Sequence, residues 1–142
     1  MINQQDQALL SLLRQNARTS VSDLARRLHL SRSTVQNRIA RLEASGVIRG
    51  YSLELGGAYA AHQVEAHVSI KVHQKLTART NQALEQIFAV AQLYSVSGEY
   101  DLLAIVQAQS LEALSTVLDD IGNLEGVERT NSAVVLETRF RR

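Results

Sequence analysis

Hydrophobic residues near the start of the chain recur at helical spacing in three short runs. Four leucines between residues 9 and 13 form the first run, and Asn3 with Asp6 supplies a helix cap before it. The second and third runs cover residues 21–28 and 35–42. The pattern therefore predicts three short helices within the first 45 residues.

The second and third predicted helices are separated by a short turn. Ser20 and Ser31 each precede one of them, and a serine hydroxyl at that position accepts a backbone N–H that the first turn leaves unpaired. The helical period stops at residues 29–31 and then resumes. This arrangement predicts a helix-turn-helix, whose second helix enters the major groove of double-stranded DNA.

The third helix has one aliphatic side and one polar side. If Val35 and Leu42 face the core, Ser33, Gln36 and Asn37 face outward, and these side chains suit base edges. They are the predicted base-reading residues. The predicted contacts to DNA phosphates are Ser31, Arg32, Thr34, Arg38, Arg41 and Arg49.

The alternative interpretation is that these arginines only form a solvated helical face. The distribution of charge favours DNA binding. Up to Gly50 there are eight arginines and three acidic residues, whereas from Tyr51 onward seven basic residues face eleven acidic ones. The first part of the chain is therefore suited to a polyanion, although the total charge is only +1.

A change of pattern follows the third helix. Residues 47–53 alternate like a short strand, which predicts a wing beside the helix-turn-helix, and the double glycine at 56–57 predicts a linker. We expect a DNA-binding domain at residues 1–54, a linker at 55–63 and a second domain at 64–142.

Strand and helix patterns alternate through the second domain. The predicted elements are a strand at 64–72, a helix with an apolar stripe from Ala83 to Phe88, strands at 90–96 and 101–108, a helix capped by Ser110 with a stripe from Leu111 to Ile121, and a last strand from Val127 to about Arg139. The order βαββαβ predicts a ferredoxin-like sandwich, so the whole chain belongs to the α+β class.

Two unbroken apolar runs, at residues 102–106 and 133–136, lie in strands of this sheet. An antiparallel sheet normally keeps one polar face, so these runs predict that both faces are covered. Helices cover one face, and a second copy of the chain in a two-fold dimer is the expected cover for the other. The linker or the DNA-binding domain is the alternative cover.

Composition sets outer limits on the function. The chain has 142 residues, 45% of them hydrophobic, and no cysteine, so no disulfide or thiolate site is expected. The first residues lack a basic leader, and no apolar run approaches the roughly 18 residues of a membrane span. We expect a soluble cytoplasmic protein with no metal, no cofactor and no membrane partner.

The order and spacing of short motifs across both domains resemble the Lrp/AsnC family of transcription factors, also called feast/famine regulators. The residues that carry the resemblance are Asp6, Asn16-Ala17-Arg18, Leu24-Ala25, Leu30-Ser31, Arg38-Ile39, Arg41-Leu42-Glu43, Gly46-Val47-Ile48, Ser97-Gly98-Glu99-Tyr100-Asp101 and Gly126-Val127. The resemblance implies a sequence-specific regulator that forms homodimers, assembles them into octamers or related rings, and binds a small effector, most often an amino acid.

The resemblance also implies where the effector binds. The positions that match the family site are Ser97, Gly98, Glu99, Tyr100, Asp101, Thr130 and Ser132. A glycine lets backbone N–H groups approach a carboxylate, and an aspartate pairs with an ammonium group. Without the resemblance, Gly98 suggests an ordinary hairpin turn and Asp101 a strand-end cap.

Two other functions fit the same fold. A DNA-bending protein without a regulated operator shares every residue of the DNA-binding domain. A sirohaem-decarboxylase-like enzyme needs oriented histidines, but His62, His67 and His73 show no catalytic or metal-site spacing, so we do not expect an enzyme. Family members often have a proline after the capping serine, whereas this chain has none, so its operator preference is not inferred from the family.

Overall fold

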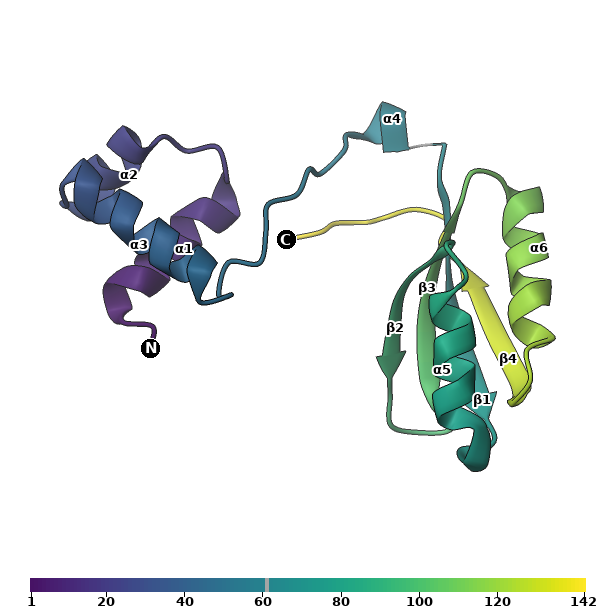
Figure 1. Ribbon diagram of the computed structural model, residues 1–142. Coiled ribbons are helices and arrows are strands. Elements are labelled where there is room, and N and C mark those ends of the chain that lie inside the picture. Colours follow the sequence, from purple (N-terminus) through teal and green to yellow (C-terminus); the bar gives the residue numbers. More distant parts are fainter. Residues whose placement is uncertain (61) are drawn as a thin grey trace. The chain divides into compact units, whose positions relative to one another are not determined.

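The computed structural model describes residues 1–60 and 62–142. These residues form two compact units, Met1–Glu54 and Leu55–Arg142 (Figure 1). Among the described residues, no helix is long and apolar enough to cross a membrane.

The first unit is a bundle of three helices, α1 (Gln4–Gln15), α2 (Val21–Leu28) and α3 (Arg32–Ala44). Its core combines the apolar stripes of all three, with further apolar residues packed at the margin. The buried members are Leu9, Leu13, Leu24, Ala25, Val35 and Leu42. The three helices and the helix-turn-helix predicted from the sequence are confirmed.

The predicted helix caps are present. Asn3 and Asp6 form a capping box on α1, and the Ser20 hydroxyl accepts the Asp23 N–H at 3.1 Å on α2. Ser31 accepts the Thr34 N–H at 3.2 Å on α3. The turn before α3 uses His29 in the left-handed conformation, with φ of 56°. These contacts fix where α3 begins.

The strand predicted at residues 47–53 is wrong, because these residues are assigned to no strand in the first unit. A strand needs a partner for its backbone N–H and C=O groups, and no other segment of this unit supplies one. Tyr51 and Leu53 stay 53% and 86% exposed. Within the predicted linker, Gly57–Ala60 forms the short helix α4, and residue 61 lies outside the described residues.

After α4, the second unit consists of a four-stranded antiparallel sheet with two further α-helices, in the order βαββαβ (Figure 1). The strands run in the spatial order β2-β3-β1-β4. Its elements are β1 (Val64–Val72), the 3-10 turn η1 (Gln74–Leu76), α5 (Thr77–Glu85), β2 (Val90–Ser95), β3 (Leu102–Ala108), α6 (Leu111–Gly122) and β4 (Val127–Val134). The predicted ferredoxin-like sandwich is confirmed.

Both helices pack on one face of this sheet. Every second residue of β1 and β3 is buried against Leu84 of α5 and against Leu114 and Ile121 of α6. The alternate residues, such as His67 and Leu103, point to the other face. One face of the sheet therefore carries the core, and neither α5 nor α6 packs on the other.

Three details of the second unit differ from the sequence prediction. Phe88 is fully exposed because α5 ends at Glu85, and Leu111 is 65% exposed because it is the first residue of α6. The last strand ends at Val134 and not near Arg139, because its partner β1 begins at Val64. The Val135 N–H donates to the Glu65 carbonyl at 2.8 Å, and beyond it the described residues show no further strand pairing.

Candidate nucleic-acid interface and effector site

The outward side of α3 is polar and open. Ser33, Gln36 and Asn37 are exposed, whereas Val35 is fully buried beneath them. The spacing of one helical turn puts the three polar side chains on one strip, which carries hydrogen-bond donors and acceptors suited to base edges. The structure thus brings the three predicted base-reading residues together on the surface.

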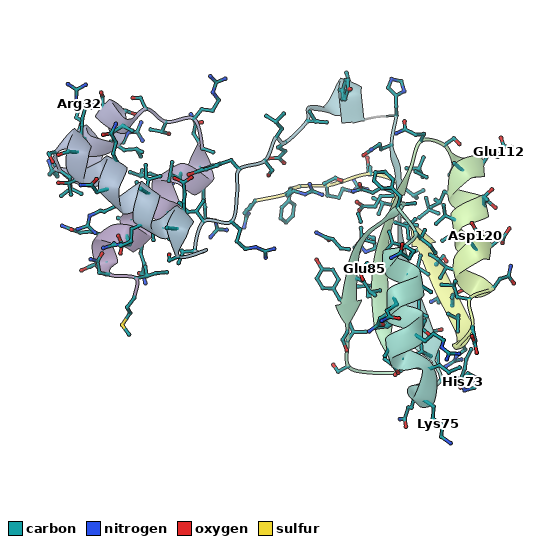
Figure 2. All side chains as sticks on the ribbon, in the orientation of Figure 1. Arg32, His73, Lys75, Glu85, Glu112 and Asp120 are labelled. Carbon is teal, nitrogen blue, oxygen red and sulfur yellow. The ribbon has the colours of Figure 1, made fainter. Side chains whose placement is uncertain are left out.

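The beginning of α3 carries a cluster of hydroxyl groups. The Ser31 Oγ atom lies 2.7 Å from Thr34 Oγ1 and 3.2 Å from Ser33 Oγ. Beside them, Arg32 extends outward from the helix, with Nη1 3.4 Å from Ser22 Oγ (Figure 2). Unpaired backbone N–H groups, hydroxyls and a guanidinium together suit an anionic phosphate.

A buried carboxylate joins α1 to α3. Asp6 is fully buried, and its carboxylate accepts from Arg38 Nη1 at 2.9 Å and from Arg41 Nη2 at 2.7 Å. The pKa of Asp6 is lowered, chiefly because the Asn3 backbone N–H donates to it; burial raises it, and the two guanidiniums lower it further. The carboxylate therefore stays charged and holds both arginines.

This cluster separates the predicted phosphate contacts into two groups. The Arg38 side chain is only 18% exposed and also donates to Asn3 and Gln5 of the α1 region, so its guanidinium is engaged within the unit. Arg41 pairs with Asp6 but keeps 56% of its side chain exposed. Arg32 and Arg49 are exposed. Sequence reasoning missed these pairs because 32 and 35 residues separate the partners.

In the second unit, the turn between β2 and β3 reaches the start of β4. Gly98 has φ of +111°, a conformation that other residues rarely adopt. Glu99 pairs with Arg129 at 2.7 Å, and the Arg129 guanidinium lies 5.2 Å from the centre of the Tyr100 ring. Sequence reasoning missed Arg129, because the cross-strand register that places it is not visible in one sequence.

Asp101 has structural partners. Its Oδ2 atom accepts the Val72 N–H at 2.9 Å and lies 3.6 Å from Lys71 Nζ. The β1–β4 register shifts between Lys71 and Val72, so Asp101 supplies an acceptor where the sheet is irregular. The strand-end cap, which was the alternative interpretation of this residue, is therefore formed.

Thr130 and Ser132 do not join the Glu99–Arg129 pair. Thr130 lies opposite Ile70 and Ser132 opposite Val68, so both belong to the side of the sheet that carries the helices. Arg129 lies opposite Lys71 and belongs to the other side. The predicted effector residues of this chain are therefore divided between the two faces.

Two hollows on the surface lie away from the predicted effector residues. One, of about 770 Å³, lies between α1 and residues 47–54, and contains only Arg49 of the predicted residues. The other, of about 730 Å³, is formed by residues 71–76 and Glu128. Neither includes the turn at residues 97–101.

Two of the four histidines each pair with a single carboxylate. His67 lies 3.2 Å from Glu65 and His73 lies 3.0 Å from Glu128. Within the described residues no group of three or more histidine, aspartate or glutamate side chains is placed to hold a metal ion.

Comparisons with known proteins agree with this architecture. Residues 2–49 match the family described as winged helix-turn-helix DNA-binding, and residues 65–142 match the Lrp/AsnC ligand binding domain. The chain is 30% identical over 140 residues to the HTH-type transcriptional regulator LysM of Sulfurisphaera tokodaii, covering 98% of each chain.

Solved structures give the same result. AsnC of Escherichia coli is 25% identical with a TM-score of 0.88, and the alignment covers 100% of this chain and 97% of that one. A feast or famine regulatory protein from Mycobacterium tuberculosis, solved in complex with L-methionine, is 33% identical with a TM-score of 0.88, over 99% and 96% of the two chains. The chain therefore belongs to the Lrp/AsnC family of transcriptional regulators.

Proposed function

We propose that this regulator reads its operator with Ser33, Gln36 and Asn37 in the major groove of double-stranded DNA. The observation that carries the proposal is the exposed polar strip of α3, which lies over a fully buried Val35. Asparagine and glutamine amides suit adenine, and a serine hydroxyl pairs with several bases. With two such helices in a dimer, half-sites are spaced by about 10 bp or a multiple.

Phosphate contacts fix the register of this helix on the duplex. Ser31, Thr34 and Arg32 at the beginning of α3, together with the exposed Arg41 and Arg49, are suited to this role. We assign Arg38 a different role: it holds α3 against α1 through Asp6.

Selection of binding sites from random duplexes tests the proposal. Replacing Gln36 and Asn37 together by Ala is expected to cost about 1–3 kcal/mol for each lost base contact and to relax the selected sequence. Arg32→Ala is the control, because it is expected to weaken all sequences equally and to reduce the log-log salt slope by about 0.9. If the double variant selects the same site as the parent, α3 does not read bases through this strip.

We further propose that an amino acid modulates DNA binding through the second unit. The M. tuberculosis relative was solved in complex with L-methionine. In this chain the Glu99–Arg129 pair and the Gly98 backbone offer charged and polar partners for the two ends of an amino acid. Neither of the two hollows described above includes this turn, and we place the effector where copies of the protein meet.

Thermal unfolding in the presence of each amino acid, with L-methionine first, tests the effector. A true ligand at 100 times its dissociation constant adds about 2.7 kcal/mol to the free energy of unfolding.

Two substitutions of Asp101 test whether this residue contacts the effector or only accepts a hydrogen bond within the sheet. If Asp101 contacts the effector, both Asp101→Asn and Asp101→Ala are expected to abolish the effector response. If Asp101 only accepts the Val72 N–H, Asp101→Asn is tolerated. Asp101→Ala then lowers the free energy of unfolding by about 1–3 kcal/mol, because it leaves the Val72 N–H unpaired.

The proposed assembly is a homodimer that forms octamers or related rings in the cytoplasm. An effector changes DNA binding only through different affinities for two assemblies or conformations. We therefore expect saturating effector to change the assembly size on DNA, the DNA bend angle, or both.

A further inference from the structure

The segment after β4 is basic and exposed. Residues 135–142 contain three arginines and one glutamate, and beyond Val135 they join no helix or strand (Figure 1). Leu136 is 94% exposed, Phe140 is 76% exposed, and the Arg139 side chain is 85% exposed. We call residues 135–142 the basic arm.

The charge of the basic arm is opposite to that of its unit. Residues 55–134 carry four basic and nine acidic side chains. Three of these four cations are paired: Lys71 with Asp101, Arg79 with Glu125 and Arg129 with Glu99. In the arm, Arg139 pairs with Glu137, but the described residues give Arg141 and Arg142 no carboxylate partner. The uncompensated positive charge of the unit therefore lies mainly in the arm.

The chemistry of the arm suits nucleic acid. All three cations are arginines, which bind phosphate oxygens through two N–H groups and also stack on flat rings. Phe140 lies between them in sequence, and the Arg142 guanidinium lies 5.1 Å from the centre of its ring. Exposed cations interleaved with an aromatic ring are typical of segments that bind nucleic acid.

We propose that the basic arm binds the phosphate backbone of the DNA that α3 reads, as a second and sequence-independent contact. This inference rests on the proposed function. Eight extended residues span at most about 29 Å, enough to pass several phosphates of a duplex that carries one charge per about 1.7 Å. Each contact between an arginine and a phosphate releases counterions condensed on the DNA, which favours binding. Isolated carboxylates do not provide this contribution.

The acidic outer side of α6 on another copy is the competing partner. Glu112 and Asp120 lie on that helix, which has no basic residue to balance them (Figure 2). Pairs between exposed side chains are weak and are screened by salt. We therefore favour DNA, and the experiment includes an outcome that assigns the arm to the other copy.

The test measures affinity for a random-sequence duplex as a function of salt, with the full chain and the variant R139Q/R141Q/R142Q. We expect the log-log salt slope to fall by about 0.9 for each lost contact, and affinity at 0.15 M salt to fall about 10- to 100-fold. The control, K75Q/R79Q, removes two cations from η1 and α5 and is expected to leave the slope unchanged. Unchanged unfolding of the triple variant shows that the arm is not needed for folding.

Photo-crosslinking identifies the partner directly. Phe140 is replaced by benzoylphenylalanine, and the same replacement at the fully exposed Phe88 is the control. DNA adducts at position 140 and not at 88 support the inference. A parent-like salt slope in the triple variant, or crosslinks at 140 only to protein, overturns it. If the unmodified protein itself binds no duplex, the proposed function fails instead.

Discussion

At the scale of single residues, Asp6 connects stability to the DNA-binding surface. Its buried carboxylate caps α1 and pairs with two arginines of α3, so one charge fixes two helices relative to each other. Removing one member of a buried ion pair is destabilising, because the charge that remains is neither hydrated nor paired. The orientation of the base-reading strip therefore depends on a residue that contacts no DNA.

Asp6→Asn is expected to lower the midpoint of thermal unfolding at pH 7. The folded-state pKa of Asp6 is lowered, so its contribution to stability is complete above its ordinary pKa of about 3.9 and is lost as the pH falls through the folded value. Circular dichroism should show a gap between parent and variant at pH 7 that narrows at pH 3. Asp23→Asn removes a more exposed carboxylate and is the control. An equal gap at both pH values contradicts the ionic role of Asp6.

The sequence predicted residues whose partners are near in the chain. The caps at Asn3, Ser20 and Ser31 depend on a contact three residues away, and all three are present. The partners of Asp6 and Asp101 lie about 30 residues away and were not predicted. Such contacts depend on how helices pack and on strand register, which a single sequence does not specify.

At the scale of elements, the turn into β4 depends on Gly126. Its φ is +91°, and a Cβ atom there would lie 2.4 Å from Thr80 Oγ1 and 2.9 Å from Leu76 Cβ. Thr80 is fully buried, with its hydroxyl 2.9 Å from the Leu76 carbonyl and 3.0 Å from that of Glu125. The turn before β4 is therefore packed against α5 and hydrogen-bonded to it through Thr80.

Gly126→Ala is expected to destabilise the protein by about 2–4 kcal/mol, because both the backbone and the packing oppose a side chain. Gly122→Ala is the matched control. Gly122 is the last residue of α6, and a Cβ atom added there would meet nothing within 4 Å, so Ala is expected to stabilise by about 0.5–1 kcal/mol. Urea unfolding measures both changes. If the two variants change the free energy of unfolding equally, the close approach of Thr80 and Leu76 to Gly126 does not oppose a side chain there.

The order of the secondary-structure elements was predicted better than their boundaries. The strands and helices of the second unit were predicted in the right order, because their apolar periods are long and regular. The strands predicted at 47–53 and beyond Val134 do not form, for a common reason: a strand requires a partner strand. Alternation indicates that a segment suits a sheet, but it does not show that a neighbour is present.

At the scale of the whole molecule, the sheet face opposite to α5 and α6 is the surface of the second unit for which we propose a partner. Tyr94 lies opposite Leu103 on this face, and Ile105 follows on the same strand. Tyr94 is 47% exposed, whereas Ile105 is 9% exposed. The apolar run at 102–106 predicted this surface, but the sequence does not say what covers it. Two-fold pairing of two copies is the cover that we propose.

The double variant Tyr94→Glu and Leu103→Glu is expected to prevent this pairing, because apposed copies would bury like charges at the two-fold interface. Light scattering after gel filtration should give the parent at least twice the chain mass of 15.7 kDa and move the variant toward one chain. Phe88→Glu adds a charge at a fully exposed apolar residue beyond α5 and is expected to leave the mass unchanged. If the double variant keeps the parent's mass while remaining folded, the copies do not meet through this face. In that case, the effector proposal would need another surface between copies.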